Sequence, residues 1–374
     1  MSNYLMSKAN KSMSLVEEDF RVFDLSDNKG ISEYKKALKA VGNHWPYHRY
    51  ELLNVRLHEE AKLMCFVYSL DRKVKVVMPF YMRPITVKDQ KTAYFDVTSP
   101  WGYTGPLYRG DIDEKLAKEF WGFVDQWYAE NKVVTEFVRF NFLNSHLYYS
   151  GHTVHTLYNV RGELKEDDII WDNIQSKTKN KIRNAYKNNL DFVMYHGDIS
   201  EDKVKEFYDI YISTMDRNQA VDTFYHTLDY FRQFVANNLD CCAIGMVYRD
   251  GKAVSTELFL MTDDTIFSFL GGTFSDYFKY RPNDFLKMET IKWAREKGLG
   301  FYVIGGGLKD NDSLYQYKKK FFRFDKDLQF FTGRKILNIE AYRELVSMVL
   351  PDYPVEEFTT DSVSEGYFPK YRTS

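Results

Sequence analysis

The feature that most constrains the fold is an order of elements that occurs twice along the chain. A hairpin or meander, then a helix, then a strand is predicted over residues 50–142, and the same order returns over residues 241–304. In the second copy, Asp250-Gly251 joins two strand-like segments, and this residue pair is favoured in type I′ hairpin turns. The two copies are not visibly alike in sequence. A repeat of element order alone predicts two related α/β domains side by side.

The spacing of apolar residues predicts the individual elements. Apolar side chains that recur every three or four residues indicate helices, and alternating or short apolar runs indicate strands. The predicted helices cover about residues 116–128, 173–188, 204–215, 226–238 and 282–297. The predicted strands cover three short segments within 50–82 and residues 93–98, 133–142, 191–195, 241–248, 252–261, 265–270, 301–304 and 328–332.

Length and patterning divide the chain. Its 374 residues suit two domains at roughly 100–200 residues each. Residues 150–170 are polar and weakly patterned, so we place the boundary between the domains there. We expect four parts: a flexible N-terminus at 1–15, a first domain at 16–160, a second domain at 161–340 and a C-terminal extension at 341–374.

Charge and apolar content exclude several classes of protein. Fifty-one Lys and Arg balance 53 Asp and Glu, which excludes a wholesale polycationic nucleic-acid binder and leaves any anion site to local clustering. No apolar stretch approaches the ~20 residues that span a bilayer, and the first residues do not resemble a signal peptide. The three cysteines, Cys65, Cys241 and Cys242, have no metal spacing and are odd in number. We therefore expect a cytoplasmic protein without structural disulfides or zinc.

A basic segment in the predicted helix 173–188 is a candidate anion site. Lys179, Arg183 and Lys187 recur every four residues and would share one helix face, where like charges repel. A phosphate, a pyrophosphate or RNA would offset that repulsion. The alternative interpretation is a solvated surface face.

Two further charged features could carry chemistry. Three adjacent lysines at 318–320 cannot share one helix face, so at least one flanks the aromatic pair Tyr317 and Phe321. A lysine held there near a cleft would stabilise an oxyanion or bind phosphate. The alternative interpretation is that the three lysines are simply exposed to solvent beside a packed aromatic pair. Glu257, in an alternating strand, could act as a general base toward an amine, or it could simply face solvent.

Several well-defined motifs are missing from the sequence. It has no Walker motif, no dinucleotide fingerprint, no His-rich metal spacing and no G-x-S-x-G. We therefore expect neither a metal site nor a nucleophilic triad. Glycines at 271–272 and 305–307 follow predicted strands and would let backbone N–H groups approach an anion or a carbonyl oxygen.

A set of short motifs resembles one known family. The motifs are S-P-W-G-Y-T-G-P at 99–106, K-I-R-N at 181–184, T-M-D-R at 214–217, F-L-G-G-T at 269–273, R-P-N-D-F-L at 281–286 and Y-K-K-K-F at 317–321. In this order they resemble the FemAB-like branch of the GNAT acyltransferase superfamily, over roughly residues 45–335. Members of this branch are associated with peptidoglycan bridges and cell-surface polysaccharides.

The resemblance implies both a fold and an activity. The fold would be two tandem GNAT-like domains, each a mixed, mostly antiparallel sheet flanked by helices, with the transfer site in the second. The protein would be an enzyme, an aminoacyl- or acetyltransferase that forms an amide on an amino group of a cell-envelope glycan or peptidoglycan precursor. No partner role for DNA is expected. The acyl donor would be aminoacyl-tRNA or acetyl-CoA, with no tightly bound cofactor.

The resemblance also selects site residues. The family's F-K-x-x-F segment matches residues 317–321, with Tyr317 in place of Phe, and points to Lys318 for charge stabilisation. Glu257 is the candidate for proton removal, a step that the family can leave to the substrate. We expect Trp101 and Tyr103 of the first domain to stack on a sugar. The remaining cleft candidates are Arg217, Tyr280, Arg281 and Asn283.

Two departures from the family bear on the donor. Acetyl-CoA-binding members carry R/Q-x-x-G-x-G/A, whose backbone N–H groups hold the pyrophosphate at a helix N-terminus. Residues 281–286 have no glycine, Pro282 lacks an N–H, and Asp284 adds a negative charge. Conversely, the chain has no heptad run as long as the coiled-coil arm of many tRNA-using members. Two alternatives therefore stay open: a CoA-dependent N-acetyltransferase acting on an amino sugar, and a non-catalytic GNAT-like protein that binds an anion or RNA.

Overall fold

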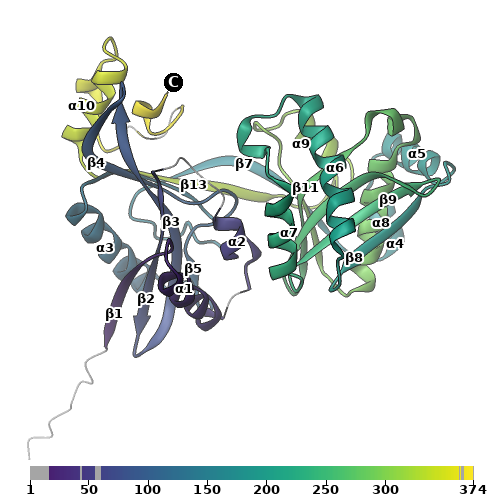
Figure 1. Cartoon of the computed structure of the whole chain (residues 1–374), viewed down its shortest axis with the longest axis horizontal. Helices are drawn as coiled ribbons and strands as arrows, with labels where there is room; N and C mark the ends of the chain where they lie inside the picture. The colour runs from purple at the N-terminus through teal and green to yellow at the C-terminus, as the bar shows by residue number, and fades with distance from the viewer. Residues whose placement is uncertain (1–16, 43, 55–59, 362, 364–365, 374) are drawn as a thin grey trace, which may run out of the picture.

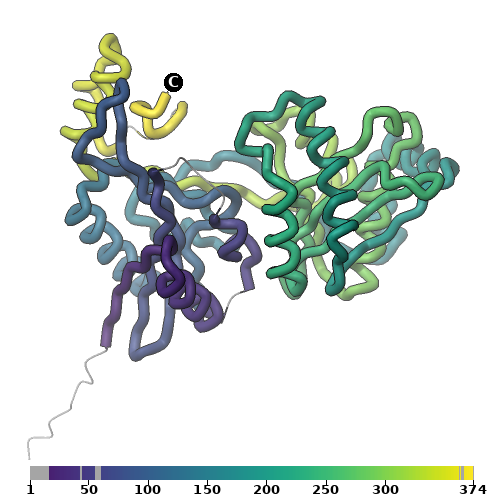
Figure 2. Tube along the Cα trace, in the orientation of Figure 1, coloured from purple at the N-terminus to yellow at the C-terminus, as the bar shows by residue number. Residues whose placement is uncertain are grey.

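The described residues form two lobes joined by two long strands. The computed structural model describes residues 17–373, except residues 43, 55–59, 362 and 364–365, so the expected flexible segment 1–15 lies outside the described residues. Strands β7 (His152–Glu163) and β13 (Leu328–Ile336) run between the lobes (Figure 1). Figure 2 shows the chain passing from the first lobe into the second and returning near its C-terminal end.

The elements follow the chain in this order. The first lobe begins with β1 (Glu18–Asp24), α1 (Asn28–Val41), η1 (Pro46–His48), α2 (Tyr50–Leu53), β2 (Lys62–Leu70), β3 (Lys73–Val87), β4 (Gln90–Thr98), β5 (Leu107–Tyr108), α3 (Glu114–Glu130) and β6 (Val133–Arg139). After β7, the second lobe holds α4 (Asp167–Asn173), α5 (Ser176–Ala185), β8 (Asp191–His196), α6 (Glu201–Asn218), η2 (Asp222–Phe224), α7 (Leu228–Asn237), β9 (Cys242–Arg249), β10 (Lys252–Met261), β11 (Thr265–Thr273), η3 (Ser275–Tyr280), α8 (Pro282–Glu296), β12 (Phe301–Gly305) and α9 (Ser313–Lys319). After β13, the chain ends in the first lobe with α10 (Ile339–Val349), η4 (Val355–Glu357) and η5 (Lys370–Arg372).

The two lobes repeat one sheet topology. The strand order is β1-β2-β3-β4-β6-β13-β7-β12-β11-β10-β9-β8. In the first lobe, antiparallel pairs lead from β1 to β4, β4 and β6 are parallel, and β6 pairs with β13 antiparallel. The second lobe repeats this from β8 to β11, with β11 and β12 parallel and β12 antiparallel to β7. Helix α3 connects the first parallel pair and α8 the second, so the predicted repeat of element order is confirmed.

The lobes exchange their last strands. β7 follows β6 along the chain, yet its second half pairs with β12, with Phe301 opposite Glu163. β13 follows the second lobe, yet its second half pairs with β6, with Thr332 opposite Arg139. The segment 150–170, predicted to be weakly patterned, therefore contains a shared strand of 12 residues. The first part of β7 is partly exposed and lacks a clean alternation, and the expected boundaries at residues 160 and 340 stay predictions.

Two predicted elements differ in the structure. No strand forms at residues 50–53, where α2 is a single helical turn that follows η1. The helix predicted over 173–188 is present as the shorter α5, and extended backbone at Ile174 and Gln175 separates it from α4, a helix that was not predicted. The side chain of Asn173 favours this break because it accepts from the Phe324 N–H at 2.8 Å and donates to Asp325 at 2.7 Å.

Apolar side chains from both lobes form one shared core cluster. It contains Tyr34 and Trp45 from the first lobe and Phe207, Phe231 and Phe267 from the second. The Trp45 and Phe267 rings meet edge-on with their centroids 5.3 Å apart. Because each buried aromatic side chain removes a large apolar area from water, this cluster fixes one lobe against the other. Within the described ranges, no helix is long and apolar enough to cross a bilayer.

Candidate active site

The candidate site lies where strands β11 and β12 part. They pair only over Thr265–Phe267 and Phe301–Val303, although β11 continues to Thr273. The register between β10 and β11 shifts here, so that Phe269 is an extra, unpaired residue in β11. Such a bulge bends a strand and ends its regular pairing. The backbone of the second half of β11 is therefore free of β12, and side chains from α8 and α9 reach the end of β12.

Lys318 reaches this point from the last turn of α9. The helix begins firmly because the Asp312 carboxylate accepts from the N–H groups of Leu308 at 2.7 Å and Tyr315 at 2.8 Å. The Lys318 Nζ donates to the Gly306 carbonyl at 2.6 Å. Burial, with Lys287 nearby as a second cause, lowers the pKa of Lys318 to about 8. Lys318 is therefore a cation at neutral pH that can lose its charge in mildly alkaline solution.

Glycine at the end of β12 makes room for this amine. Gly305 has a φ of +90°, and a Cβ there would lie 3.4 Å from the Lys318 Nζ. A larger residue would be strained by the backbone and would crowd the ammonium group.

Glu257 lies in a buried ion pair next to Lys318. Its two carboxylate oxygens accept from the Lys287 Nζ at 2.7 and 2.6 Å. The same Nζ donates to the Ser268 and Tyr302 hydroxyls, each at 3.1 Å. Glu257 therefore does not face solvent, which was the alternative interpretation of this residue. A role as general base stays a prediction, and it would require this ion pair to open.

Side chains of α8 and α9 fill the space at the first turn of α8, where a pyrophosphate would bind. The Tyr317 hydroxyl accepts from Asn283 Nδ2 at 3.0 Å and lies 3.1 Å from the Asp284 carboxylate, to which it donates. Burial raises the pKa of Asp284, which is 6% exposed. Pro282 begins the helix without an N–H. A pyrophosphate placed here would meet a carboxyl group and one missing donor instead of an open row of amides.

The other candidates of the second lobe support the neighbouring backbone. Arg217 donates to the Thr273 carbonyl at the end of β11, at 2.8 Å. The Tyr280 ring lies under the Arg249 guanidinium, 3.4 Å from its carbon to the ring centroid. Arg281 is exposed, with a φ of +62°, directly before α8. The structure thus brings Asn283 to Tyr317, the residue before Lys318. Arg217, Tyr280 and Arg281 lie instead around the start of α8 and the end of β11.

Trp101 and Tyr103 differ in their surroundings. The Tyr103 ring packs against Phe142 and Tyr47, with centroids 4.3 and 5.0 Å away, and burial raises the pKa of its hydroxyl. That hydroxyl donates to Asn159 Oδ1 at 2.8 Å. Trp101 is the more exposed ring at 49%. Stacking on a sugar stays a prediction for both, and Trp101 is better placed for it.

The three basic residues of the predicted anion site do not share one helix face. Lys179 and Arg183 lie over the Trp171 ring of α4, at 5.7 and 5.1 Å from its centroid. Lys179 also pairs with Asp172 at 3.3 Å. The helix α5 ends at Ala185, so Lys187 lies beyond it. The predicted continuous face is wrong because the helix stops before its third basic residue.

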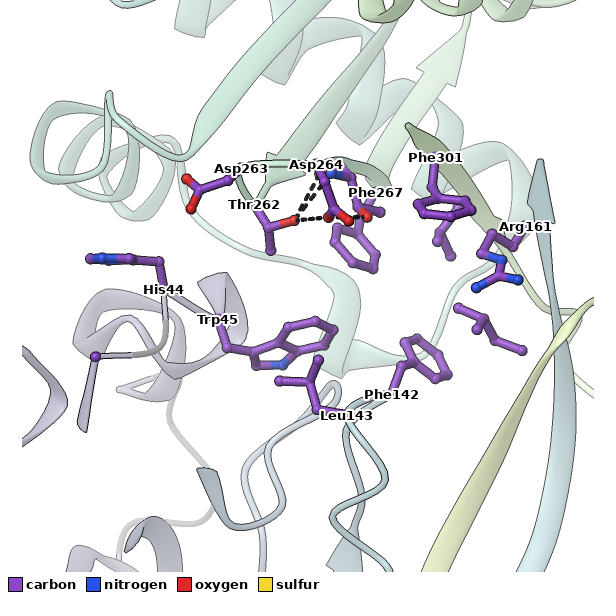
Figure 3. A pocket seen from close by; sticks show the side chains of 14 residues that line it. His44, Trp45, Phe142, Leu143, Arg161, Thr262, Asp263, Asp264, Phe267 and Phe301 are labelled. Carbon is purple, nitrogen blue, oxygen red and sulfur yellow. Dashed lines mark hydrogen bonds between the residues drawn. The ribbon is translucent and has the colours of Figure 1, made fainter. Parts of the chain in front are cut away.

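Two pockets lie along the junction between the lobes. One, of about 420 Å³, is drawn in Figure 3, with Arg161 and Phe301 at one end and His44 and Asp263 at the other. The other, of about 280 Å³, is lined by arginines and aromatic rings of the first lobe and by aromatic rings of the second. Its residues include Arg83, Arg139, Trp101, His226, Tyr230 and Phe269. Within the described ranges, no cluster of three or more His, Cys, Asp or Glu side chains could hold a metal ion.

Sequence reasoning missed several residues of this region. Lys287 lies in a helix whose pattern does not show that its amine meets a strand. Asn159, 2% exposed in β7, has no hydrogen-bond partner for its Nδ2 within the described structure, and a Cβ on Gly306 would lie 3.3 Å from its Oδ1. Arg83 and Arg139 belong to separate strands. No local signal joins these side chains, because their neighbours come from distant parts of the chain.

Comparisons with known proteins identify a domain family in the second lobe and similar folds for most of the chain. Residues 176–319 match the acetyltransferase (GNAT) domain family. Among curated protein sequences, none matches this chain significantly. The crystal structure of FemX is similar with a TM-score of 0.59 and 12% identity, over 84% of this chain and 97% of that one.

Two structures of a second kind are also similar. The C-terminal domain of a putative lysylphosphatidylglycerol synthetase from Agrobacterium fabrum matches with a TM-score of 0.52 and 13% identity, over 82% of this chain and 92% of that one. The structure of L-PGS from Bacillus licheniformis matches with a TM-score of 0.53 and 12% identity, over 81% of this chain and 91% of that one. At such identities, the likeness is one of fold.

Proposed function

We propose that this chain transfers an acyl group to an amine, because residues 176–319 match the acetyltransferase (GNAT) domain family and the fold is similar to that of FemX. Both findings agree with the resemblance and the fold class expected from its motifs. The domain supports acyl transfer in general. The finer proposal is an amide-forming aminoacyltransferase whose acceptor is an amino group of a cell-envelope glycan or peptidoglycan precursor. The observation that carries this proposal is the partly buried Lys318 amine at the parting of β11 and β12.

The proposed reaction requires charge stabilisation at one place. A neutral amine attacks the donor's carbonyl carbon, and the carbonyl oxygen becomes an oxyanion. Lys318 supplies positive charge to that oxygen in a site with little water, where such an interaction is strong. When the tetrahedral intermediate collapses, the bond to the donor's leaving group breaks and the new amide remains.

The amine's proton must also leave. Glu257 is already bound by Lys287, so its use as a base would break a buried ion pair. We assign the proton to the leaving oxygen of the donor instead. Glu257 then acts as a positioning residue, because its charge opposes the effects that lower the pKa of Lys318.

The donor that best suits the start of α8 is an aminoacyl ester such as aminoacyl-tRNA. Pro282 and the buried Asp284 disfavour a pyrophosphate there, and acetyl-CoA depends on such a cradle in related domains. Aminoacyl-tRNA is made in the cytoplasm, so we place the reaction there.

Thermal melting tests the donor directly. A ligand at 100 times its dissociation constant should stabilise the protein by about 2.7 kcal/mol. We expect charged tRNA to raise the melting temperature more than uncharged tRNA, and we expect the shift to shrink at higher salt. A shift with acetyl-CoA and CoA alone would overturn the donor assignment. No shift with either class would contradict both donors.

The pH dependence of turnover tests the role of Lys318. As pH rises through about 8, Lys318 loses its proton and the oxyanion loses its counter-charge, so the rate should fall on the alkaline side. Lys318→Arg keeps the charge at these pH values and should move that fall to higher pH. The acceptor amine titrates equally in both proteins, so the ratio of their kcat values isolates Lys318. A ratio independent of pH would contradict the proposed role.

A further inference from the structure

The smaller pocket at the junction holds more positive charge than its surroundings balance. The Asp96 carboxylate, 1% exposed, binds Arg83 Nε at 2.7 Å and Arg372 Nε at 2.5 Å. Its single charge is thus shared by two guanidinium groups. Arg139 Nη1 donates to the Ser99 carbonyl at 3.1 Å, a neutral group. Across the residues described, no carboxylate forms a salt bridge with Arg139.

The missing counter-charge shows in the chemistry of Arg139. Burial lowers its pKa to about 10, and the nearby charge of Arg83 acts in the same direction. Arg139 and Arg83 both line the pocket. An anion between them would supply the missing charge, and guanidinium groups suit the paired oxygens of phosphate and carboxylate.

The aromatic side chains of the pocket suit a ring. Trp101, Phe269 and Tyr230 line the pocket together with His226. Burial lowers the pKa of His226 to about 4, so this imidazole is neutral at physiological pH. These side chains are therefore uncharged and largely aromatic, and an environment of low polarity strengthens the attraction of the arginines for an anion.

The pocket adjoins the proposed transfer site along two segments. Phe269 is the bulged residue of β11, and the preceding Ser268 is bound to Lys287 in the group beside Lys318. Trp101 lies in the loop that continues to Tyr103, whose hydroxyl meets Asn159 of β7. A ligand whose charged end lies between the arginines would lie against Phe269, the residue that follows Ser268 in β11.

From this geometry we propose that the pocket binds the acidic group of the acceptor, a phosphate or carboxylate on a ring-bearing molecule, between Arg83 and Arg139. The inference rests on the proposed function, since it names this pocket as the acceptor's subsite. It restricts the acceptor to an anion that carries both a ring and an amine.

Calorimetric titration without any donor tests this subsite. The probes are glucosamine 1-phosphate, glucuronate and inorganic phosphate, so the first two separate a phosphate from a carboxylate ligand. We expect one of the two ring-bearing probes to bind more tightly than inorganic phosphate. Arg139→Gln should weaken that binding at least tenfold, and Arg139→Lys should weaken it less.

Matched controls separate the subsite from general electrostatics and from catalysis. The control variant is Arg72→Gln, because the Arg72 side chain is 86% exposed and lies outside the pocket. It removes the same charge and should leave binding of the probe unchanged. Lys318→Met should bind the probe like the unmodified protein, so a failed transferase assay would not remove the subsite. Equal weakening by Arg72→Gln, unchanged binding in Arg139→Gln, or no binding of either ring-bearing probe would each overturn the proposal. If Arg139→Gln fails to fold, the titration is done with Trp101→Ala and Arg139→Lys instead. The proposal requires both variants to bind the probe more weakly than the unmodified protein.

Discussion

Replacing Lys318 by Met is expected to slow acyl transfer severely and, at about pH 7, to make the folded chain more stable. Loss of one group that stabilises an oxyanion typically slows turnover by about 10²–10³-fold. The stability gain arises because the folded protein holds a proton on Lys318 less tightly than the unfolded chain does. A charged amine in this position costs on the order of 2 kcal/mol, which the apolar Met side chain avoids.

The pH dependence of that gain follows from the sign of the pKa shift. The pKa of Lys318 is about 8 when folded, against an ordinary value of 10.5. The cost of the buried charge is therefore present in full below about pH 8 and disappears as pH rises toward 10.5. Urea unfolding at about pH 7 and about pH 10 should show the advantage of Lys318→Met shrinking at the higher pH.

The neighbouring lysine provides a matched control. Lys319 donates to Asp327 at 2.8 Å and to the Asp325 carbonyl at 2.7 Å. Lys319→Met should therefore lose stability at both pH values and retain transfer. Full activity in Lys318→Met would remove Lys318 from the mechanism. An equal stability difference at both pH values would contradict the shifted pKa.

The second large effect is expected at the buried ion pair. Lys287→Met leaves the Glu257 carboxylate, with its side chain 11% exposed, without its partner. Breaking a buried pair by removing one member costs about 3–5 kcal/mol. The double variant Glu257→Gln, Lys287→Met removes the stranded charge and should recover much of this loss. Urea unfolding of the two single variants and the double variant measures the coupling between the residues.

The same variants separate a structural from an electrostatic effect on Lys318. Glu257 raises the pKa of Lys318 and Lys287 lowers it. In Glu257→Gln the alkaline fall in turnover should therefore move to lower pH, and in Lys287→Met it should move to higher pH. If Glu257 and Lys287 had a purely structural role, the two variants would change kcat but would not change the pH at which kcat falls. If the stability losses of the two single variants add up to the loss of the double variant, Glu257 and Lys287 are not coupled.

Sequence patterns were sufficient where the signal is local. The helix predicted over 282–297 is present as α8, which begins at Pro282, and Asp250-Gly251 adopts positive φ angles of 50° and 77° at the hairpin turn. The resemblance of the Y-K-K-K-F segment to the family's F-K-x-x-F motif selected Lys318 from three lysines, and the structure places that amine at the end of β12, while its role in transfer stays a prediction. Each of these features depends on residues close together in the sequence.

The rest depends on contacts between distant segments. The pairing of Glu257 with Lys287 depends on which strand α8 crosses, and no periodicity in either segment shows it. The same holds for Arg83 in β3 and Arg139 in β6. Both side chains line one pocket because of the order of the strands in the folded sheet, which neither segment shows by itself. The helix predicted over residues 173–188 begins only at Ser176, because Asn173 is bound by a loop 151 residues away in the sequence.

The exchanged strands have a consequence for the order in which the protein forms during synthesis. The first lobe leaves the ribosome first, but its sheet lacks β13 until residues 328–336 have been made. The second lobe has β7 from the beginning and can close its sheet as soon as β12 emerges. Domains generally fold in the order of translation, but here the lobe translated first completes its sheet last. A nascent chain stalled before β13 would therefore expose one edge of β6, where a chaperone or a second chain could bind.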